Sequence, residues 1–178
     1  MRASRQDISV GTKAIGDESG QALVEFAVIA PLLFILAFGI IDFSRAIYHM
    51  QVMTGLTRQG SNLASRGTDL PTTVASVIAG DAPLDLNKNG EVIVSSVTNT
   101  GGVFKISGQL SQGAMTAPSK IGVGVGATAT LPAAAAIVLQ PNQTIYVTEV
   151  YYSYQPITPI KNMLKIALPS TLYDVAYF

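Results

Sequence analysis

The chain has 178 residues, of which 48% are hydrophobic and only 12% charged, and its eleven basic residues balance eleven acidic ones. Soluble domains carry about 25% charged residues, so this composition indicates membrane or assembly surfaces. Without a basic surface to neutralise phosphates, we expect no nucleic-acid binding. The chain has no cysteine and one histidine, which excludes disulfides and thiolate chemistry and leaves little for histidine-based metal sites or catalytic triads. We therefore expect no enzyme activity, cofactor or small-molecule substrate.

The strongest signal is an apolar segment near the start of the chain. Residues 1–20 are polar and nearly neutral, whereas residues 21–41 form an apolar zone in which 22–41 are interrupted only by Glu25 and Pro31. A bilayer core of about 30 Å needs about 20 apolar residues in a helix, so we predict a membrane-spanning helix here. Pro31 is either a tolerated kink or a place where the backbone opens during polymerisation. Basic residues are balanced on the two sides, so charge gives no orientation.

The helical pattern continues beyond the apolar segment. Between residues 42 and 66 apolar side chains recur every three or four positions, which predicts an extension of the same helix as a stem. Ser19 is the expected N-cap and Gly67 the expected stop. Asp42 and Arg45, three residues apart, are expected to form a local ion pair at the membrane interface. His49 is expected at a surface or interface rather than as a metal ligand.

Residues 67–178 predict a small α+β domain with an antiparallel sheet. The expected elements are a helix at 71–79, a hairpin with strands 91–98 and 103–109 around a turn at 99–102, a loop with a possible short strand at 111–130, a helical turn at 132–138, a strand at 144–154, and either two strands or a loop and a strand in 161–178.

One segment of this domain has partial calcium-loop spacing. Asp85, Asn87 and Asn89 place oxygens at positions 1, 3 and 5, and glycine follows at position 6. Position 12 is Ser96, which cannot supply the bidentate carboxylate, and Glu91 is only a conceivable substitute. We favour the alternative of a turn that leads into the strand at Glu91, and we predict no metal site.

An acid inside the apolar segment requires a reason. A carboxylate at the centre of a membrane helix costs about 2.5–3.5 kcal/mol, and Glu25 lies five residues after Gly20. One explanation is that Glu25 sits near the interface, where this cost is smaller. The other is charge pairing: a cut after Gly20 would give Gln21 a positive α-amine, which Glu25 of a neighbouring helix could neutralise, with Phe26 packing beside it.

Several motifs accompany this acid. Near it stand Val24-Glu25-Phe26-Ala27 and Pro31, and further along stand Gly39-Ile40-Ile41-Asp42-Phe43-Ser44-Arg45 and, near the C-terminus, Glu149-Val150-Tyr151-Tyr152-Ser153-Tyr154-Gln155-Pro156. Together they resemble the TadE-like family of the tight-adherence (Flp) branch of type IV pilin-like proteins. The resemblance covers about 50 residues closely; residues 59–66 match more loosely, with departures at Gln59 and Asn62.

The resemblance implies a pilin-like fold and a minor pilin or pseudopilin. A prepilin peptidase would cut between Gly20 and Gln21, leaving residues 1–20 as a cytoplasmic leader, 21–66 as the transmembrane and stem helix, and 67–178 in the periplasm. The expected partners are that peptidase, other pilin or pseudopilin subunits, the assembly platform of the bacterial inner membrane, and lipid. The protein would stay in that membrane or join a surface pilus or its tip. The alternative is a membrane-anchored, adhesin-like binding module that keeps its leader.

Overall fold

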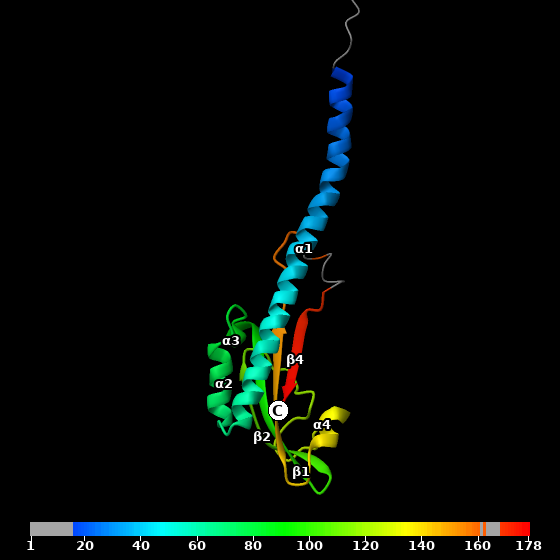
Figure 1. The fold of residues 1–178 in the computed structure, drawn as a ribbon. Coiled ribbons are helices and arrows are strands. Elements are labelled where there is room, and N and C mark those ends of the chain that lie inside the picture. The colour runs from blue at the N-terminus through cyan, green and yellow to red at the C-terminus, as the bar shows by residue number, and fades with distance from the viewer. Residues whose placement is uncertain (1–15, 161, 163–167) are drawn as a thin grey trace, which may run out of the picture.

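The computed structural model describes residues 16–160, 162 and 168–178, and consists of one long helix with a small helix-and-sheet unit beside its C-terminal half (Figure 1). The elements in chain order are α1 (Gly16–Ser65), α2 (Leu70–Ala79), α3 (Leu86–Asn89), β1 (Gly90–Thr100), β2 (Val103–Gly113), α4 (Ala133–Val138), β3 (Thr144–Ser153) and β4 (Thr171–Tyr177).

Helix α1 combines the two predicted parts, apolar segment and stem, in one continuous element that curves gently (Figure 1). It begins at Gly16, so the prediction that Ser19 is its N-cap was wrong. The predicted stop is confirmed: Gly67 has a φ of 92° and its N–H donates to the carbonyl of Ala64 at 3.0 Å. Only glycine adopts this backbone conformation without strain, so the chain turns here towards α2.

The four strands form one antiparallel sheet in the order β2-β1-β3-β4. The predicted hairpin is β1 and β2, joined by Gly101 and Gly102, whose φ values of 64° and 88° suit a tight hairpin turn. Strand β2 continues to Gly113, three residues into the segment predicted to be a loop. In the C-terminal segment β4 pairs with β3; residues 161 and 163–167, where the other predicted element falls, lie outside the described residues.

The shorter helices lie close to their predicted positions. Helix α2 starts after Asp69, whose carboxylate accepts from the N–H of Thr72 at 3.1 Å, and it carries Pro71 in its first turn. Helix α4 occupies most of the predicted helical turn. The segment between β2 and α4 adds one isolated bridge, from Thr128 to Lys105 of β2, where the sequence allowed a short strand.

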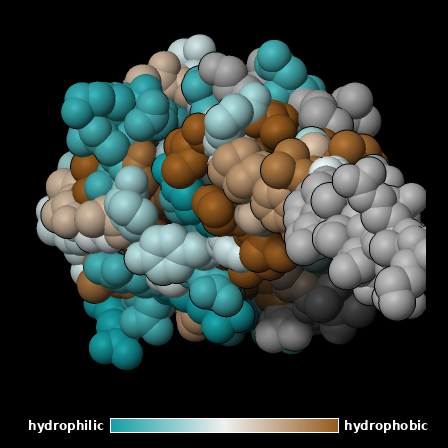
Figure 2. All heavy atoms as spheres, turned by 90° about the horizontal axis from the view of Figure 1, so that it is seen from above, coloured by the Kyte–Doolittle hydropathy of each residue, from teal (hydrophilic) through white to brown (hydrophobic). Residues whose placement is uncertain are grey.

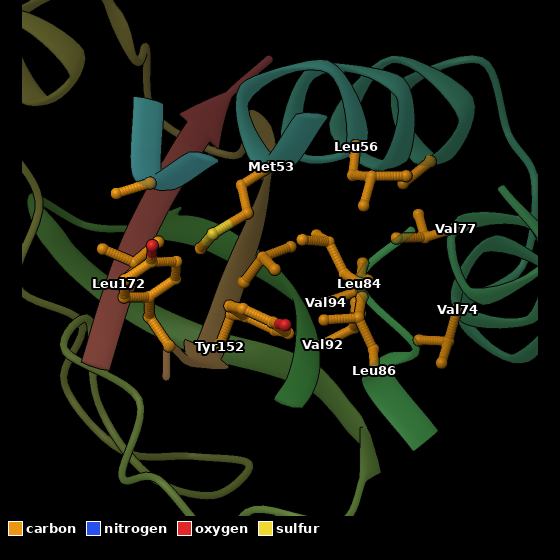
Figure 3. Close-up of a cluster of buried hydrophobic side chains, with 14 of the residues drawn as sticks. Met53, Leu56, Val74, Val77, Leu84, Leu86, Val92, Val94, Tyr152 and Leu172 are labelled. Carbon is orange, nitrogen blue, oxygen red and sulfur yellow. The ribbon is translucent and has the colours of Figure 1, made fainter. Parts of the chain in front are cut away.

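The sheet has two differently covered faces. On one face, α1 and α2 pack on valines and tyrosines of β1 and β3 to form the main core (Figure 3). On the other face, the long segment after β2 covers a smaller cluster that includes Val97, Ile106 and Ile121. The observed fold is therefore the predicted α+β arrangement of a long N-terminal apolar helix followed by a small antiparallel sheet.

Candidate membrane and assembly site

The first half of α1, from Gly20 to Ile41, is the most exposed apolar surface of the described chain. None of its residues is buried, and its leucines, isoleucines and phenylalanines point outwards on all sides of the helix. Figure 2 views the molecule from above, the side from which α1 begins, and hydrophobic side chains gather in the middle of this view. By length and composition, α1 could cross a membrane once. A helix that is apolar all round needs lipid or other helices around it.

The predicted processing and pairing residues lie at the start of this surface. Gly20 is exposed, and a Cβ added there would meet nothing within 4 Å. The side-chain amide of Gln21 donates to Oε1 of Glu25 at 3.0 Å, one helical turn away. Phe26 is exposed beside them. The structure thus supplies an intrachain partner for the acid, which lowers the cost of placing Glu25 in an apolar setting.

Pro31 lies inside α1, and the helix continues on both sides of it. A proline lacks the N–H that would bond to the carbonyl four residues earlier. No break in the helix accompanies it, so the two roles considered for Pro31, a tolerated kink and a point of opening, both stay predictions.

Asp42 marks the point where α1 first meets the rest of the chain. Its side chain is fully buried and accepts hydrogen bonds from the N–H of Ile157 at 3.0 Å, from the N–H of Thr158 at 3.4 Å and from the hydroxyl of Thr158. Its own carbonyl accepts from the Tyr154 hydroxyl at 2.6 Å. Asp42 therefore ties the loop after β3 to the end of the apolar segment.

The expected ion pair between Asp42 and Arg45 is not formed, because the carboxylate is turned towards this loop. Nη1 of Arg45 is buried without a hydrogen-bond partner among the described residues. The expected surface position of His49 was also wrong: the imidazole is buried and meets the rings of Tyr152 and Tyr154 edge-on, at centroid distances of 5.1 and 5.6 Å. The loop after β3 covers the Asp42 carboxylate, and two tyrosine rings cover the His49 imidazole. A helical pattern alone does not reveal either contact.

Further along, α1 docks on β3 and β4 through small and polar residues. Thr57 donates to the Asp174 carboxylate at 2.6 Å, and Ser61 donates to the carbonyl of Ala176 at 2.9 Å. A Cβ added to Gly60 would lie 2.7 Å from Oγ1 of Thr148. The lack of a side chain at Gly60 therefore lets the helix approach the sheet closely.

The opposite face of the sheet holds a buried acid that sequence reasoning assigned no role. Glu149 accepts from the N–H of Lys120 and the hydroxyl of Tyr173, each at 2.9 Å, and from the hydroxyl of Ser119. Burial, and then the charge of Glu149, raise the pKa values of Tyr173 and Tyr151 well above their usual range. These bonds fasten the long segment after β2 to the sheet. The sequence did carry a signal for this contact, because Glu149 is an acid in the middle of a strand of β-branched and aromatic residues.

The calcium-loop candidates do not converge on one point. Asp85 pairs with Lys88 at 2.7 Å, Asn87 accepts from Gln112, and Asn89 donates to the carbonyl of Leu84. Glu91 accepts from the N–H of Ala117 at 2.6 Å. Residues 86–89 form α3 instead of an open loop, so the favoured turn into the strand is here a short helix. Among the described residues, no group of three or more acidic, histidine or cysteine side chains is placed to hold a metal ion.

Comparison with known protein families gives a match in the first part of the chain. Residues 20–62 match the family model described as TadE-like protein. This match agrees with the TadE-like resemblance recognised from the sequence and covers the first part of the chain only. The matched residues begin at the predicted processing glycine, include Glu25, Pro31 and Asp42, and end within the docked half of α1. No curated protein and no solved structure matches the chain.

Proposed function

We propose that this chain is a minor pilin or pseudopilin of a tight-adherence pilus system. In this proposal residues 1–20 are a cytoplasmic leader, which a prepilin peptidase removes between Gly20 and Gln21. Residues 21–66 are the transmembrane and stem helix, and residues 67–178 lie in the periplasm. The mature subunit is stored in the inner membrane and joins other pilin or pseudopilin subunits on the assembly platform through its N-terminal helix.

One observation carries the proposal: the TadE-like match begins at Gly20 and runs into a helix whose first half is apolar on all sides. A plain anchor would need only the apolar residues. The carboxylate of Glu25, which accepts a hydrogen bond from the side-chain amide of Gln21, could exchange this partner for a charged one. Cleavage would create an α-amine on Gln21, and a carboxylate bonded to an ammonium is stabilised more than one bonded to a neutral amide. Glu25 can thus pass from the amide of its own chain to the amine of a neighbour.

The intact mass of the membrane-extracted protein tests the cleavage step, with and without the peptidase. We expect a species that begins at Gln21 only when the peptidase is present. The Gly20→Val variant should keep its leader, because the substitution places a branched side chain beside the bond that the peptidase cuts. Gly39→Val is the matched control on the same helix, also without neighbours within 4 Å, and should be cut normally. A full-length species in the presence of an active peptidase would favour the anchored binding module.

The pairing step has its own test. Glu25→Gln keeps the size of the side chain and its ability to bond Gln21 but removes the charge. We expect membrane insertion and cleavage to be unchanged and incorporation into pili or assembly intermediates to fall. Normal incorporation of Glu25→Gln would remove the charge-pairing role.

A further inference from the structure

The loop that follows β3 is fixed at a defined point along α1. Ile157 and Thr158 bond to the carboxylate of Asp42, and Tyr154 bonds to its carbonyl. Asp42 is the residue that directly follows the apolar segment ending at Ile41. The loop therefore lies at the end of the sheet unit nearest to the exposed half of α1, where it appears in orange in Figure 1.

The composition of this loop suits an apolar boundary. Residues 155–160 read Gln-Pro-Ile-Thr-Pro-Ile and carry no charged side chain. Ile157 is 65% exposed, although its backbone N–H is held by a buried acid. On the adjacent turns of α1, Phe43 and Ile47 are also exposed, and they line an apolar groove that continues to Leu168 and Pro169. One exposed isoleucine is ordinary, but a group of apolar side chains at one end of a domain indicates a contact surface.

The length of the apolar segment of α1 determines where these exposed apolar side chains lie relative to the bilayer. Residues 22–41 extend for about 30 Å at 1.5 Å per residue, which is the thickness of the hydrocarbon core. If they span the core, Asp42 lies at its edge. The backbone of Ile157, 3.0 Å from the Asp42 carboxylate, then lies at the same depth. Tyrosine is enriched at the membrane–water interface, and Tyr48 is exposed less than two helical turns beyond Asp42.

We propose that residues 155–160 form a membrane-contacting foot, which rests on the boundary between lipid headgroups and acyl chains. Asp42 is its positioning residue: the buried carboxylate holds the foot against the lipid and thereby fixes the height of the sheet unit above the membrane. The partner is the lipid surface itself. This inference rests on the membrane anchoring in the proposed function and adds a second membrane contact to it.

The absence of cysteine from the chain permits a direct test. Ile157→Cys in the full chain is labelled with an environment-sensitive fluorophore and reconstituted into phosphatidylcholine vesicles. We expect a blue-shifted emission and strong quenching by lipids that carry a nitroxide near the headgroup. The matched control is Val125→Cys, which is equally exposed at 68% and lies next to Gly126, bonded to Ile106 towards the far end of the sheet. Its label should stay water-like and weakly quenched.

A positioning role for Asp42 predicts a second readout. In the labelled protein, Asp42→Ala should return the emission of the Ile157 label towards that of the control while α1 stays inserted. Asp42→Asn, which keeps an oxygen acceptor of the same size, should give a smaller change. An unchanged signal in Asp42→Ala would overturn the positioning role.

The outcomes also separate this inference from the proposed function. Vesicle flotation and the intact mass report insertion and cleavage independently of the label. A floated, cleavable protein whose Ile157 label stays water-like overturns the foot and leaves the pilin proposal standing. A protein that does not insert overturns both. A blue shift that disappears when the protein is diluted in excess lipid also overturns the foot, because the contact would then be with a second copy.

Discussion

The two halves of α1 belong to one unbroken helix but are stabilised in different ways. From Gly20 to Ile41 every described side chain is at least partly exposed, and apolar residues surround the helix. From Asp42 to Ser65 buried and exposed positions alternate at helical spacing, and the buried ones meet the sheet and α2. The first half therefore depends on an environment outside the chain, whereas the second half is part of the folded domain.

This contrast shows what a helix needs in order to dock on a sheet. Small or polar residues, such as Gly60 and Ser61, occupy positions where the docked half comes close to strand backbones or side chains. In the exposed half, a Cβ added at Gly39 would meet nothing within 4 Å. The missing side chain of Gly60 is thus a packing requirement, whereas that of Gly39 is not.

The largest difference between the halves should appear when one large side chain is truncated in each. Met53 is fully buried against the sheet (Figure 3), and Leu33 is 54% exposed. We expect Met53→Ala to lower the free energy of unfolding of the sheet domain by about 3 kcal/mol, through lost burial and a residual cavity. Leu33→Ala should leave it unchanged. Both free energies of unfolding can be measured by urea unfolding of the full chain in detergent micelles, with the near-UV circular dichroism of the tyrosines as the signal. Equal losses of stability in the two variants would contradict the division of α1 into a docked and an exposed half.

Two glycines within the docked half sharpen the comparison further. A Cβ at position 60 would lie 2.7 and 2.8 Å from side-chain atoms of Thr148, whereas one at position 55 would meet nothing within 4 Å. We expect Gly60→Ala to destabilise the domain by about 2 kcal/mol through overpacking. Gly55→Ala should stabilise it by up to about 1 kcal/mol through helix propensity. The same unfolding assay applies, and a stabilising Gly60→Ala would show that the helix sits further from the sheet.

A polar contact tests the docked half on a smaller scale. Thr57 donates to the Asp174 carboxylate on β4, whereas Thr54, within the part of the chain that the structure describes, donates to the carbonyl of Met50 in its own helix. Thr57→Val should cost about 1.5 kcal/mol, because a carboxylate loses a donor at the interface. Thr54→Val should stay within about 0.5 kcal/mol of the wild type. If the two variants had equal effects, the Asp174 contact would not contribute to docking.

The smallest expected effect is a loss of stability at alkaline pH, which should involve the sheet domain and not the exposed half of α1. The pKa values of Tyr151 and Tyr173 are raised by burial and by the charge of Glu149. A phenol whose pKa is higher in the folded state contributes stability below its unfolded pKa of about 10, and that stability is lost as the pH rises above it. We expect the domain to lose about 1 kcal/mol between pH 9 and 11.

Two variants check the origin of this alkaline loss. Glu149→Gln should reduce it without abolishing it, because the burial contribution remains. Leu33→Ala should show the wild-type pH profile, since the exposed half of α1 has no part in the tyrosine cluster. A pH profile that Glu149→Gln leaves unaltered would show that the carboxylate does not influence the two phenols.

Much of the fold was predictable because its signals are local. Apolar runs, helical spacing, paired glycines and prolines indicated α1, α2, the hairpin, α4 and β3 within a few residues. The beginning of α1 at Gly16 and the extension of β2 to Gly113 were missed, although a glycine stands at each of these boundaries. The Asp69 N-cap of α2 was also missed, although an acid one residue before a helix is a recognisable signal.

In the candidate site, too, residues with a local sequence signal were predicted, and contacts between distant residues were not. Gly20, Gln21 and Glu25 were found from the sequence, since their spacing is short and an acid in an apolar segment is unusual. The structure adds the hydrogen bond between Gln21 and Glu25; cleavage and charge pairing stay predictions. Asp42 was noticed but given the wrong partner, because the helical neighbour Arg45 was the only one that sequence spacing offered. Glu149 lay in a recognised strand, but two of its donors come from a loop about thirty residues earlier and a third, Tyr173, comes from β4.

The sequence by itself determined that the chain has an apolar segment long enough for a membrane, a helix that continues past it, and an acid at its start. These properties follow from composition and from periodicity over neighbouring residues. Only the tertiary structure decided which side of the stem is buried, that Asp42 holds Ile157 and Thr158, and that His49 lies beneath two tyrosines. Those contacts join residues more than one hundred positions apart, so they depend on how the helix packs on the sheet, which local sequence patterns do not encode.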